Sequence, residues 1–103
     1  MTIMSMTAIH PHPGASWEEI QKNVKAGNDL TRKNGGENVT TMVTMIAGEA
    51  TGTVTSFWTA PDWAKFGQVQ EAIMGDPEVL ALMGTGGQTA TWSTYVSMTI
   101  PDM

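Results

Sequence analysis

Two histidines, His10 and His12, are the residues of this chain best suited to acid–base chemistry near neutral pH. They lie in the segment His-Pro-His-Pro-Gly, whose alternate spacing could bring both imidazoles to one metal ion. No third ligand lies beside them, and the fold would have to supply Glu49 or Asp62, so we expect no metal site. His10 remains a candidate catalytic base or polar contact. The alternative is a proline-stiffened loop at a strand end, without a chemical role.

Aromatic residues and methionines form a second candidate set, for binding rather than for catalysis. The chain contains 4 Trp, 1 Tyr, 2 Phe and 9 Met. Methionine lines adaptable apolar cavities, and Trp and Tyr combine an apolar body with one polar group that can orient a ligand. We therefore expect a pocket for a small apolar molecule, with these candidate ligand-binding residues: Met6, Met42, Trp58, Phe66, Trp92 and Tyr95. The alternative is ordinary core and subunit interface, which is the interpretation we prefer for Trp17 and Trp63.

The composition of the chain excludes several classes of function. Its 103 residues correspond to one small domain, spanning residues 1–103. A net charge of −5 argues against nucleic-acid binding, which needs a clustered basic face. The absence of cysteine excludes disulfides, thiolate nucleophiles and cysteine-ligated metals. No apolar run approaches the ~20 residues that cross a bilayer, and no signal-peptide pattern is present, so we expect a cytoplasmic protein without membrane contact.

Helical periodicity predicts two main helices and a short third one. The first helix follows Ser16, which forms a capping-box pattern with Glu19, and it ends at a pair of glycines, residues 35–36. The second follows Pro61, a residue that suits a first helical turn. A fresh helix start at Asp76-Pro77 predicts a short helical turn over residues 78–83, and the glycine-rich segment after it is interpreted as a loose loop.

Alternating residues predict the strands and, with them, the fold. Strands are expected over residues 2–10 and 89–99, and a hairpin over residues 38–59 has its turn between Gly48 and Gly52. The resulting order predicts an α+β, ferredoxin-like βαββαβ fold, in which a four-stranded antiparallel sheet carries its helices on one face. None of the five Lys and Arg residues falls in a predicted strand. An uncovered, charge-free face needs a partner, and we expect a homodimer formed through this sheet face.

This layout resembles the dimeric α+β barrel superfamily. The resemblance covers nearly the whole chain and rests on the helix start Ser16-Trp17-Glu18-Glu19, the hairpin segment Gly48-Glu49-Ala50-Thr51-Gly52, and Pro61-Asp62-Trp63 with the Asp76-Pro77 break. It implies two sheets packed face to face, with a cavity between sheet and helices or within the barrel. The superfamily includes cofactor-independent monooxygenases of the antibiotic-biosynthesis type, haem-degrading monooxygenases, muconolactone isomerases, stress-responsive barrels and small proteins without an assigned activity.

Three functions follow as hypotheses, and whether the chain is an enzyme stays open. Haem degradation would need an axial histidine on a helix, and no predicted helix contains one, so we expect no cofactor. The first hypothesis is a homodimer that binds a small apolar molecule, fatty-acid-like or polyketide-like. The second is a cofactor-independent monooxygenase in which Trp92, Tyr95, Asn38 or His10 orients an oxidisable phenol while a base forms its anion. The third is a non-catalytic dimerising module, which the absence of a closed pocket would favour.

Overall fold

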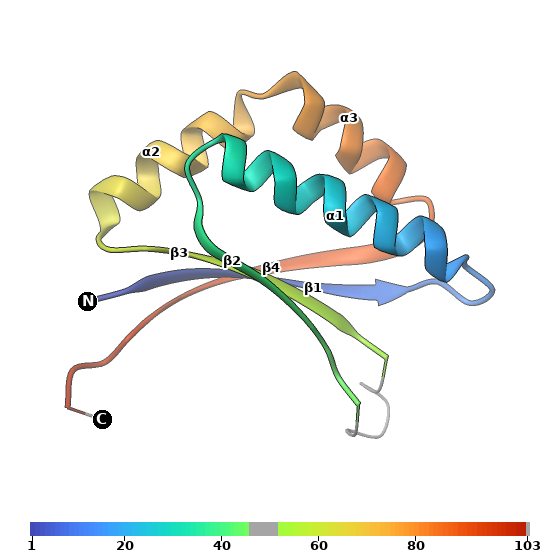
Figure 1. Cartoon of the computed structure of the whole chain (residues 1–103), viewed down its shortest axis with the longest axis horizontal. Coiled ribbons are helices and arrows are strands. Elements are labelled where there is room, and N and C mark those ends of the chain that lie inside the picture. The colour runs from blue at the N-terminus through green and yellow to red at the C-terminus, as the bar shows by residue number, and fades with distance from the viewer. Residues whose placement is uncertain (46–51, 103) are drawn as a thin grey trace.

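The computed structural model of the chain describes residues 1–45 and 52–102. In chain order its elements are β1 (Ile3–Pro11), α1 (Trp17–Lys33), β2 (Glu37–Val43), β3 (Val54–Ala60), α2 (Trp63–Met74), α3 (Pro77–Gly86) and β4 (Ala90–Met98). The strands form one antiparallel sheet in the order β2-β3-β1-β4, and the three helices lie on one face of it (Figure 1). The predicted ferredoxin-like fold is confirmed. Most of the predicted hairpin turn, including Glu49, lies outside the described residues.

Strand β1 organises the sheet because it pairs with both β3 and β4. In this register Ser5 lies opposite Trp58 on one side and Val96 on the other, and Ile9 lies opposite Val54 and Trp92. Successive side chains of a strand point to opposite faces. The odd-numbered residues of β1 therefore face the helices together with their partners on β3 and β4.

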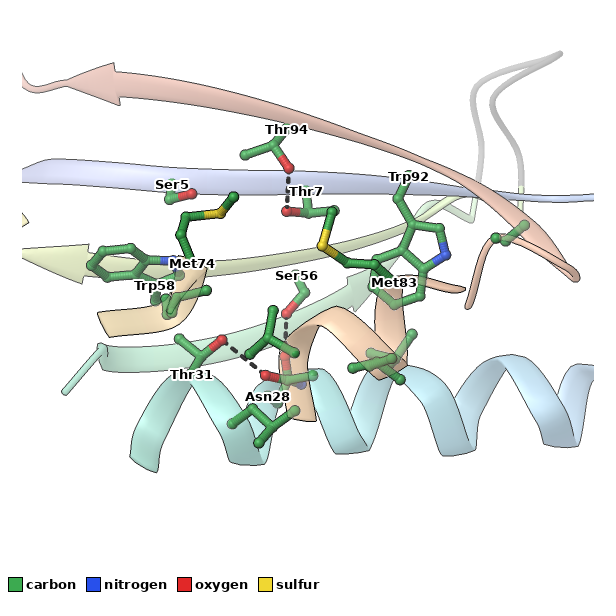
Figure 2. A pocket seen from close by; sticks show the side chains of 18 of the residues that line it. Ser5, Thr7, Asn28, Thr31, Ser56, Trp58, Met74, Met83, Trp92 and Thr94 are labelled. Carbon is green, nitrogen blue, oxygen red and sulfur yellow. Dashed lines mark hydrogen bonds between the residues drawn. The ribbon is translucent and has the colours of Figure 1, made fainter. Parts of the chain in front are cut away.

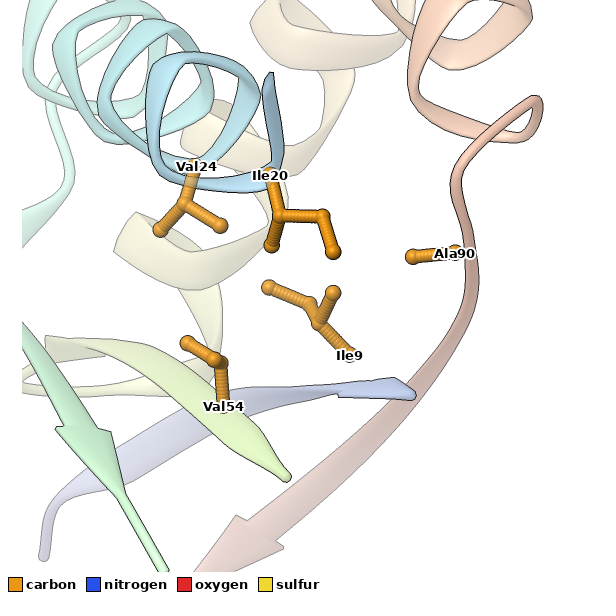
Figure 3. Packing of buried hydrophobic residues seen from close by; sticks show 5 residues of the cluster. All are labelled: Ile9, Ile20, Val24, Val54 and Ala90. Carbon is orange, nitrogen blue, oxygen red and sulfur yellow. The ribbon is translucent and has the colours of Figure 1, made fainter. Parts of the chain in front are cut away.

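The helix-side face of the sheet supports the buried core. Ile9 is fully buried and packs with Ile20 and Val24 of α1 (Figure 3), in a cluster completed by Val54 and Ala90. A second cluster under α2 joins Trp58, Ala60 and Val69 with the partly buried Phe66, whose ring stacks on that of Trp58 at a centroid distance of 5.2 Å. Burial of these side chains provides the main driving force for docking the helices onto the sheet.

The face turned away from the helices, which we call the outer face, carries uncharged side chains at its centre, while Glu37 lies opposite Thr59 at one end of β2. Met6 lies at its centre, between Phe57 on β3 and Tyr95 on β4, and Thr40 of β2 extends this row beyond Phe57. Met42 and Tyr95 are 51% and 61% exposed. The other residues of this face on the four strands include Met4, Ala8, Thr55, Ser93 and Ser97.

Two expectations about the helices are wrong. The glycine-rich segment does not form a loop, because α3 continues through Gly84 to Gly86 and ends only at the cap residue Gly87. Trp17 and Trp63 are not core residues, since they are 45% and 50% exposed. Each is the first residue of its helix and lies outside the buried clusters that hold the helix to the sheet.

The buried carboxylate of Asp76 fixes α3 to the end of α1. It caps α3 by accepting a hydrogen bond from the Glu78 backbone N–H at 2.9 Å, and it accepts two more from Asn34 Nδ2 at 3.0 Å and Lys33 Nζ at 3.2 Å. The hydrogen bond from Asn34, the backbone bond and the lysine charge together hold the pKa of Asp76 below its usual range. Over the sheet, α2 and α3 follow one another end to end and form a roof together with α1 (Figure 1).

No helix among the described residues combines the length and the apolar character that a bilayer crossing requires.

Candidate functional site

A cavity of about 590 Å³ lies between the sheet and the helical roof (Figure 2). All three helices contribute to its wall, and strands β1, β3 and β4 form its floor. We call it the helix-side cavity. Its existence follows from the spacing of large and small residues: the helix-side positions Ser5, Thr7, Ser56 and Thr94 are short, so the helices above them do not fill the space to the sheet.

The roof of the helix-side cavity is mostly apolar, although Thr31 of α1 and Gln70 of α2 also line it. Its apolar side chains come from one turn of α1, the end of α2 and the middle of α3: Leu30, Ile73, Met74, Val79, Leu82 and Met83. Met74 and Met83 are 52% and 60% exposed, so they lie where the cavity meets solvent. Unbranched methionine side chains adjust easily to the shape of what they contact.

The floor, in contrast, carries hydroxyl and amide groups that bond mainly to one another. Thr7 and Thr94 share a hydrogen bond of 3.0 Å across β1 and β4. Asn28 of α1 accepts a bond from the Ser56 hydroxyl and donates one to Thr41 at 2.7 Å (Figure 2 shows the Ser56 bond). These pairs leave a floor that is polar but uncharged and largely satisfied.

No Asp, Glu, Lys or Arg lines the helix-side cavity within the described part of the chain. The charged side chains with specific partners lie elsewhere, on the far side of α1 and at the Asp76 anchor. A second groove of about 420 Å³, between α1 and the edge strand β2, does contain charged residues, but its Asp29 is already paired with Lys25 at 2.8 Å and Arg32 at 3.2 Å. The second groove is therefore lined by paired charges, whereas the helix-side cavity is not.

Trp92 occupies one end of the helix-side cavity, where its indole is hydrogen-bonded to Gly86 and lies near Gly27. Its indole N–H donates to the Gly86 carbonyl at 3.1 Å. A Cβ placed on Gly86 would lie 3.0 Å from Trp92 Cζ2, and one placed on Gly27 would lie 4.0 Å from Trp92 Cζ3. The missing side chain of Gly86 therefore lets the indole pack close to the end of α3, whereas a Cβ on Gly27 would make only an ordinary contact.

His12, rather than His10, reaches the helix-side cavity. Its Nδ1 lies 3.3 Å from the Gln88 carbonyl oxygen, and its Nε2 lies 3.1 Å from the Thr91 hydroxyl. A carbonyl oxygen only accepts, so Nδ1 carries the proton and Nε2 accepts from Thr91. His10 is exposed, does not line this cavity, and contacts Thr53 Oγ1 at 3.4 Å through its Nδ1. Its catalytic role stays a prediction.

The residues predicted to bind ligand are divided between three places. Trp58 and Trp92 line the helix-side cavity. Phe66 lies behind Trp58 in the core, and Met6, Met42 and Tyr95 belong to the outer face. The alternation of side chains along a strand could have separated these residues. Met6 and its partner Tyr95 occupy the outer face, whereas Ser5 and its partner Trp58 occupy the helix side.

Sequence reasoning also missed several groups. The hydroxyls of the floor have no motif, and only the tertiary packing brings Asn28 to Ser56. Asn38, in contrast, is among the residues expected to orient a substrate, but it does not line the helix-side cavity. It adopts a left-handed conformation with φ 51° at the β2 irregularity and donates to Thr59 Oγ1 at 2.8 Å. Within residues 1–45 and 52–102, no three His, Cys, Asp or Glu side chains gather in a way that could hold a metal ion.

The strand order and the single layer of helices define a ferredoxin-like α+β fold. No protein-family model matches the chain, and no curated protein sequence is similar to it. Solved structures share the fold. They include a NIPSNAP family protein from Agrobacterium tumefaciens, with 12% identity and a TM-score of 0.72 over 99% of this chain and 96% of that one.

Two further neighbours cover almost the whole chain in both directions. The cofactor-independent oxygenase SnoaB from Streptomyces nogalater has 11% identity and a TM-score of 0.70, covering 98% of each chain. Rv0793 from Mycobacterium tuberculosis has 14% identity and a TM-score of 0.69, covering 99% of this chain and 98% of that one. At such identities the likeness establishes the fold and leaves the function to be argued from the site.

The contact between Gly86 and Trp92 generates a first prediction. In Gly86→Ala the new methyl group would press on a rigid indole that is also hydrogen-bonded to the same residue, so we expect the indole to shift and the protein to lose stability. Gly84→Ala is the matched control: it lies in the same helix with nothing within 4 Å of its Cβ. It should gain roughly 1 kcal/mol from helix propensity.

Thermal unfolding and near-UV circular dichroism measure both effects. A change of 1 kcal/mol corresponds to roughly 4–8 °C in Tm for a domain of this size. Gly84→Ala should raise Tm by that order, while Gly86→Ala should lower it and change the tryptophan signal. Equal rises in Tm for both variants would contradict the close packing of Trp92.

Proposed function

We propose that this protein binds a small, neutral, mostly apolar molecule in the helix-side cavity. The observation that carries the proposal is a cavity of about 590 Å³ with two tryptophans and two methionines in its lining and no charged side chain. Its volume lies within the roughly 300–1,000 Å³ that is typical of small-molecule sites. The combination of an apolar roof with a few polar groups on the floor is also typical of such sites.

The uncharged lining selects among apolar ligands. A carboxylate that enters such a cavity loses its hydration without gaining a cation, which costs several kcal/mol unless the group is neutralised. A neutral alcohol, ketone or polycyclic compound does not incur this cost. Of the two expected classes, the geometry therefore supports the polyketide-like one over the fatty-acid-like one.

The outer face supports the second part of the proposal, a homodimer. Met6, Phe57 and Tyr95 form a continuous row across three strands, and Met42 is exposed beside them. The centre of this face lacks the charges that would favour solvent, and a second copy presents a surface of identical composition related by a two-fold axis. Face-to-face packing of two sheets would bury this row at its centre.

The alternative function is a cofactor-independent monooxygenase. His12 in the cavity wall favours it, together with the fold shared with SnoaB. A phenol such as 1-naphthol would lose its proton to a base, and the anion would then react with O₂ to give 1,4-naphthoquinone and one molecule of water. On this hypothesis the base would be His12 Nε2, because His10 does not line the cavity, and the Thr91 hydroxyl would have to release its hydrogen bond to Nε2 when the phenol binds. A purely structural module explains the outer face but not the cavity.

The binding proposal predicts discrimination by charge. At pH 8, 1-dodecanol should displace the neutral dye Nile red from the protein at a concentration at least ~10-fold lower than dodecanoate, because only the carboxylate is charged. Thr94→Phe, which fills the cavity floor, should weaken dye binding, whereas Thr40→Phe on the outer face should not. Equal weakening by both substitutions, or no binding of any neutral probe, would contradict the assignment of the cavity.

The monooxygenase alternative predicts a dependence on His12. With 1-naphthol and dissolved O₂, oxygen uptake should fall by ~100-fold or more in His12→Ala, which is the typical effect of removing a general base. An oxygen electrode together with chromatography of the quinone follows the reaction. If instead His10→Ala abolishes uptake and His12→Ala does not, the base belongs to His10 and the reaction does not occur in this cavity. No uptake by the wild-type protein removes this alternative for phenols.

The homodimer predicts a mass of twice the 11.0 kDa chain in light scattering coupled to gel filtration. Tyr95→Glu should shift the protein to the monomer, because it would bury a carboxylate in the centre of the proposed interface. Gln68→Glu adds the same charge on an exposed position of α2 and should leave the dimer unchanged. A wild-type monomer at micromolar concentration would refute this part of the proposal.

A further inference from the structure

Two buried donors on the floor of the helix-side cavity have no hydrogen-bond partner in the described part of the chain. They are the Ser5 hydroxyl and the Trp58 indole N–H. Ser5 is 5% exposed and Trp58 is 7% exposed. The only fully enclosed side-chain polar atoms without a partner, among the residues described, are Asn23 Nδ2 and Thr89 Oγ1. Ser5 Oγ and Trp58 Nε1 are not enclosed in this way, so they remain accessible from the cavity.

The sheet brings the two donors together. Ser5 on β1 lies directly opposite Trp58 on β3, and both residues line the cavity. Residues opposite each other in an antiparallel pair have Cβ atoms ~4.5–5.5 Å apart. Figure 2 shows both at the same end of the cavity beside Met74, with Trp92 at the other end. Trp58 is fixed in this position by its stacking on Phe66.

The other hydroxyl groups on the floor, and the second indole N–H, differ from this pair in being already engaged. Thr7 is bonded to Thr94, Ser56 to Asn28, and the Trp92 N–H to the Gly86 carbonyl. Since most buried polar groups in proteins have a partner, two unpartnered donors side by side indicate a place for an external acceptor. An indole N–H can only donate, and a carbonyl oxygen has two lone pairs that can accept from both groups.

We propose that Ser5 and Trp58 form a subsite for the carbonyl oxygen of a neutral ligand, such as an aromatic ketone or a quinone. The inference rests on the proposed function, because it assigns an orientation to a molecule bound in the helix-side cavity. The carbonyl end of the ligand lies beside Met74, and its apolar body extends along the roof toward Trp92. A carboxylate does not fit this subsite, because no cation lines the cavity to balance its charge.

Three probes with one carbon skeleton test the subsite: fluorene, 9-fluorenone and 9-fluorenol. Isothermal titration gives the dissociation constant of each. Two neutral hydrogen bonds, at ~0.5–1.5 kcal/mol each, should make the ketone bind roughly 10-fold tighter than the hydrocarbon. The alcohol should bind more weakly than the ketone. Equal affinity of alcohol and ketone would overturn the assignment to a carbonyl group.

Substitutions separate the subsite from the rest of the cavity. Ser5→Ala and Trp58→Phe should each weaken fluorenone binding by ~3-fold to ~10-fold and change fluorene binding by less than ~2-fold. Trp92→Phe is the matched control, because its N–H is already donated to Gly86 and its loss should leave the ratio of the two affinities unchanged. Ser5→Ala is the smaller change and keeps the test valid if Trp58→Phe does not fold.

The carbonyl stretching band of bound fluorenone provides a readout independent of affinity. Hydrogen bonds to the oxygen should shift this band to lower frequency in the wild-type protein and in Trp92→Phe, and each donor variant should reverse part of the shift. Tight binding of all three probes with an unshifted band would overturn the subsite while leaving the proposed function intact. If none of the probes binds, the proposed function fails, and the subsite fails with it.

Discussion

The register of β1 against its two neighbours is the constraint on which the rest of the structure depends. Side chains alternate along a strand, so moving the pairing by one residue would exchange every helix-side group for an outer-face group. In the observed register Ser5 meets Trp58 on the cavity side, and Met6 meets Phe57 and Tyr95 on the outer face. One strand thus determines both the polar floor of the cavity and the apolar surface opposite it.

The helix-side residues change in size along β1, and this change explains the cavity. Around Ile9 the helix-side positions are occupied by branched side chains that fill the space up to α1. At the other end of β1, Ser5 and Thr7 are too short to fill the space, and Met74 and Met83 line it only on the side of the helices. A protein interior normally packs without such gaps, because each gap forfeits dispersion contacts and burial energy. The gap under the helices persists because the hydrogen bonds of Asp76 hold α3 to the end of α1, and these bonds do not depend on contacts across the cavity.

The fold could be predicted from the sequence because its signals are local. The cap at Ser16, the helix start at Asp76-Pro77 and the alternating strands each depend on a few neighbours in the chain, although the second helix begins at Trp63 after the cap Asp62 and does not include Pro61. The end of α3 could not be predicted in this way. Gly84 and Gly86 are unfavourable for a helix, and the helix persists because the Trp92 ring, from the next strand, packs against Gly86.

The site could be predicted only in part, for a related reason. Trp58 and Trp92 were identified from residue type alone, and both line the cavity. The sequence does not reveal that His12 bonds Thr91 while His10 contacts Thr53, because each histidine is followed by proline and the two are only two residues apart. Nor does it distinguish the free N–H of Trp58 from the engaged one of Trp92. The two histidines differ, and the two tryptophans differ, in their hydrogen-bond partners. Many of these partners lie far away in the chain, so no local sequence pattern predicts them.

The pairing of β1 with β4 also has a consequence for how the chain reaches this structure. Ile3 lies opposite Met98, and the Thr99 backbone N–H donates to the Thr2 carbonyl, so contacts separated by nearly the whole sequence close the sheet. Contacts of such high sequence separation slow folding, because the entropy of a long loop is lost before they form. During synthesis β1 precedes β4, so the edge of β1 that pairs with β4 stays unpaired until β4 leaves the ribosome. Over that interval an open, methionine-bearing strand edge is available to other chains, and misassembly is most favoured before β4 has paired.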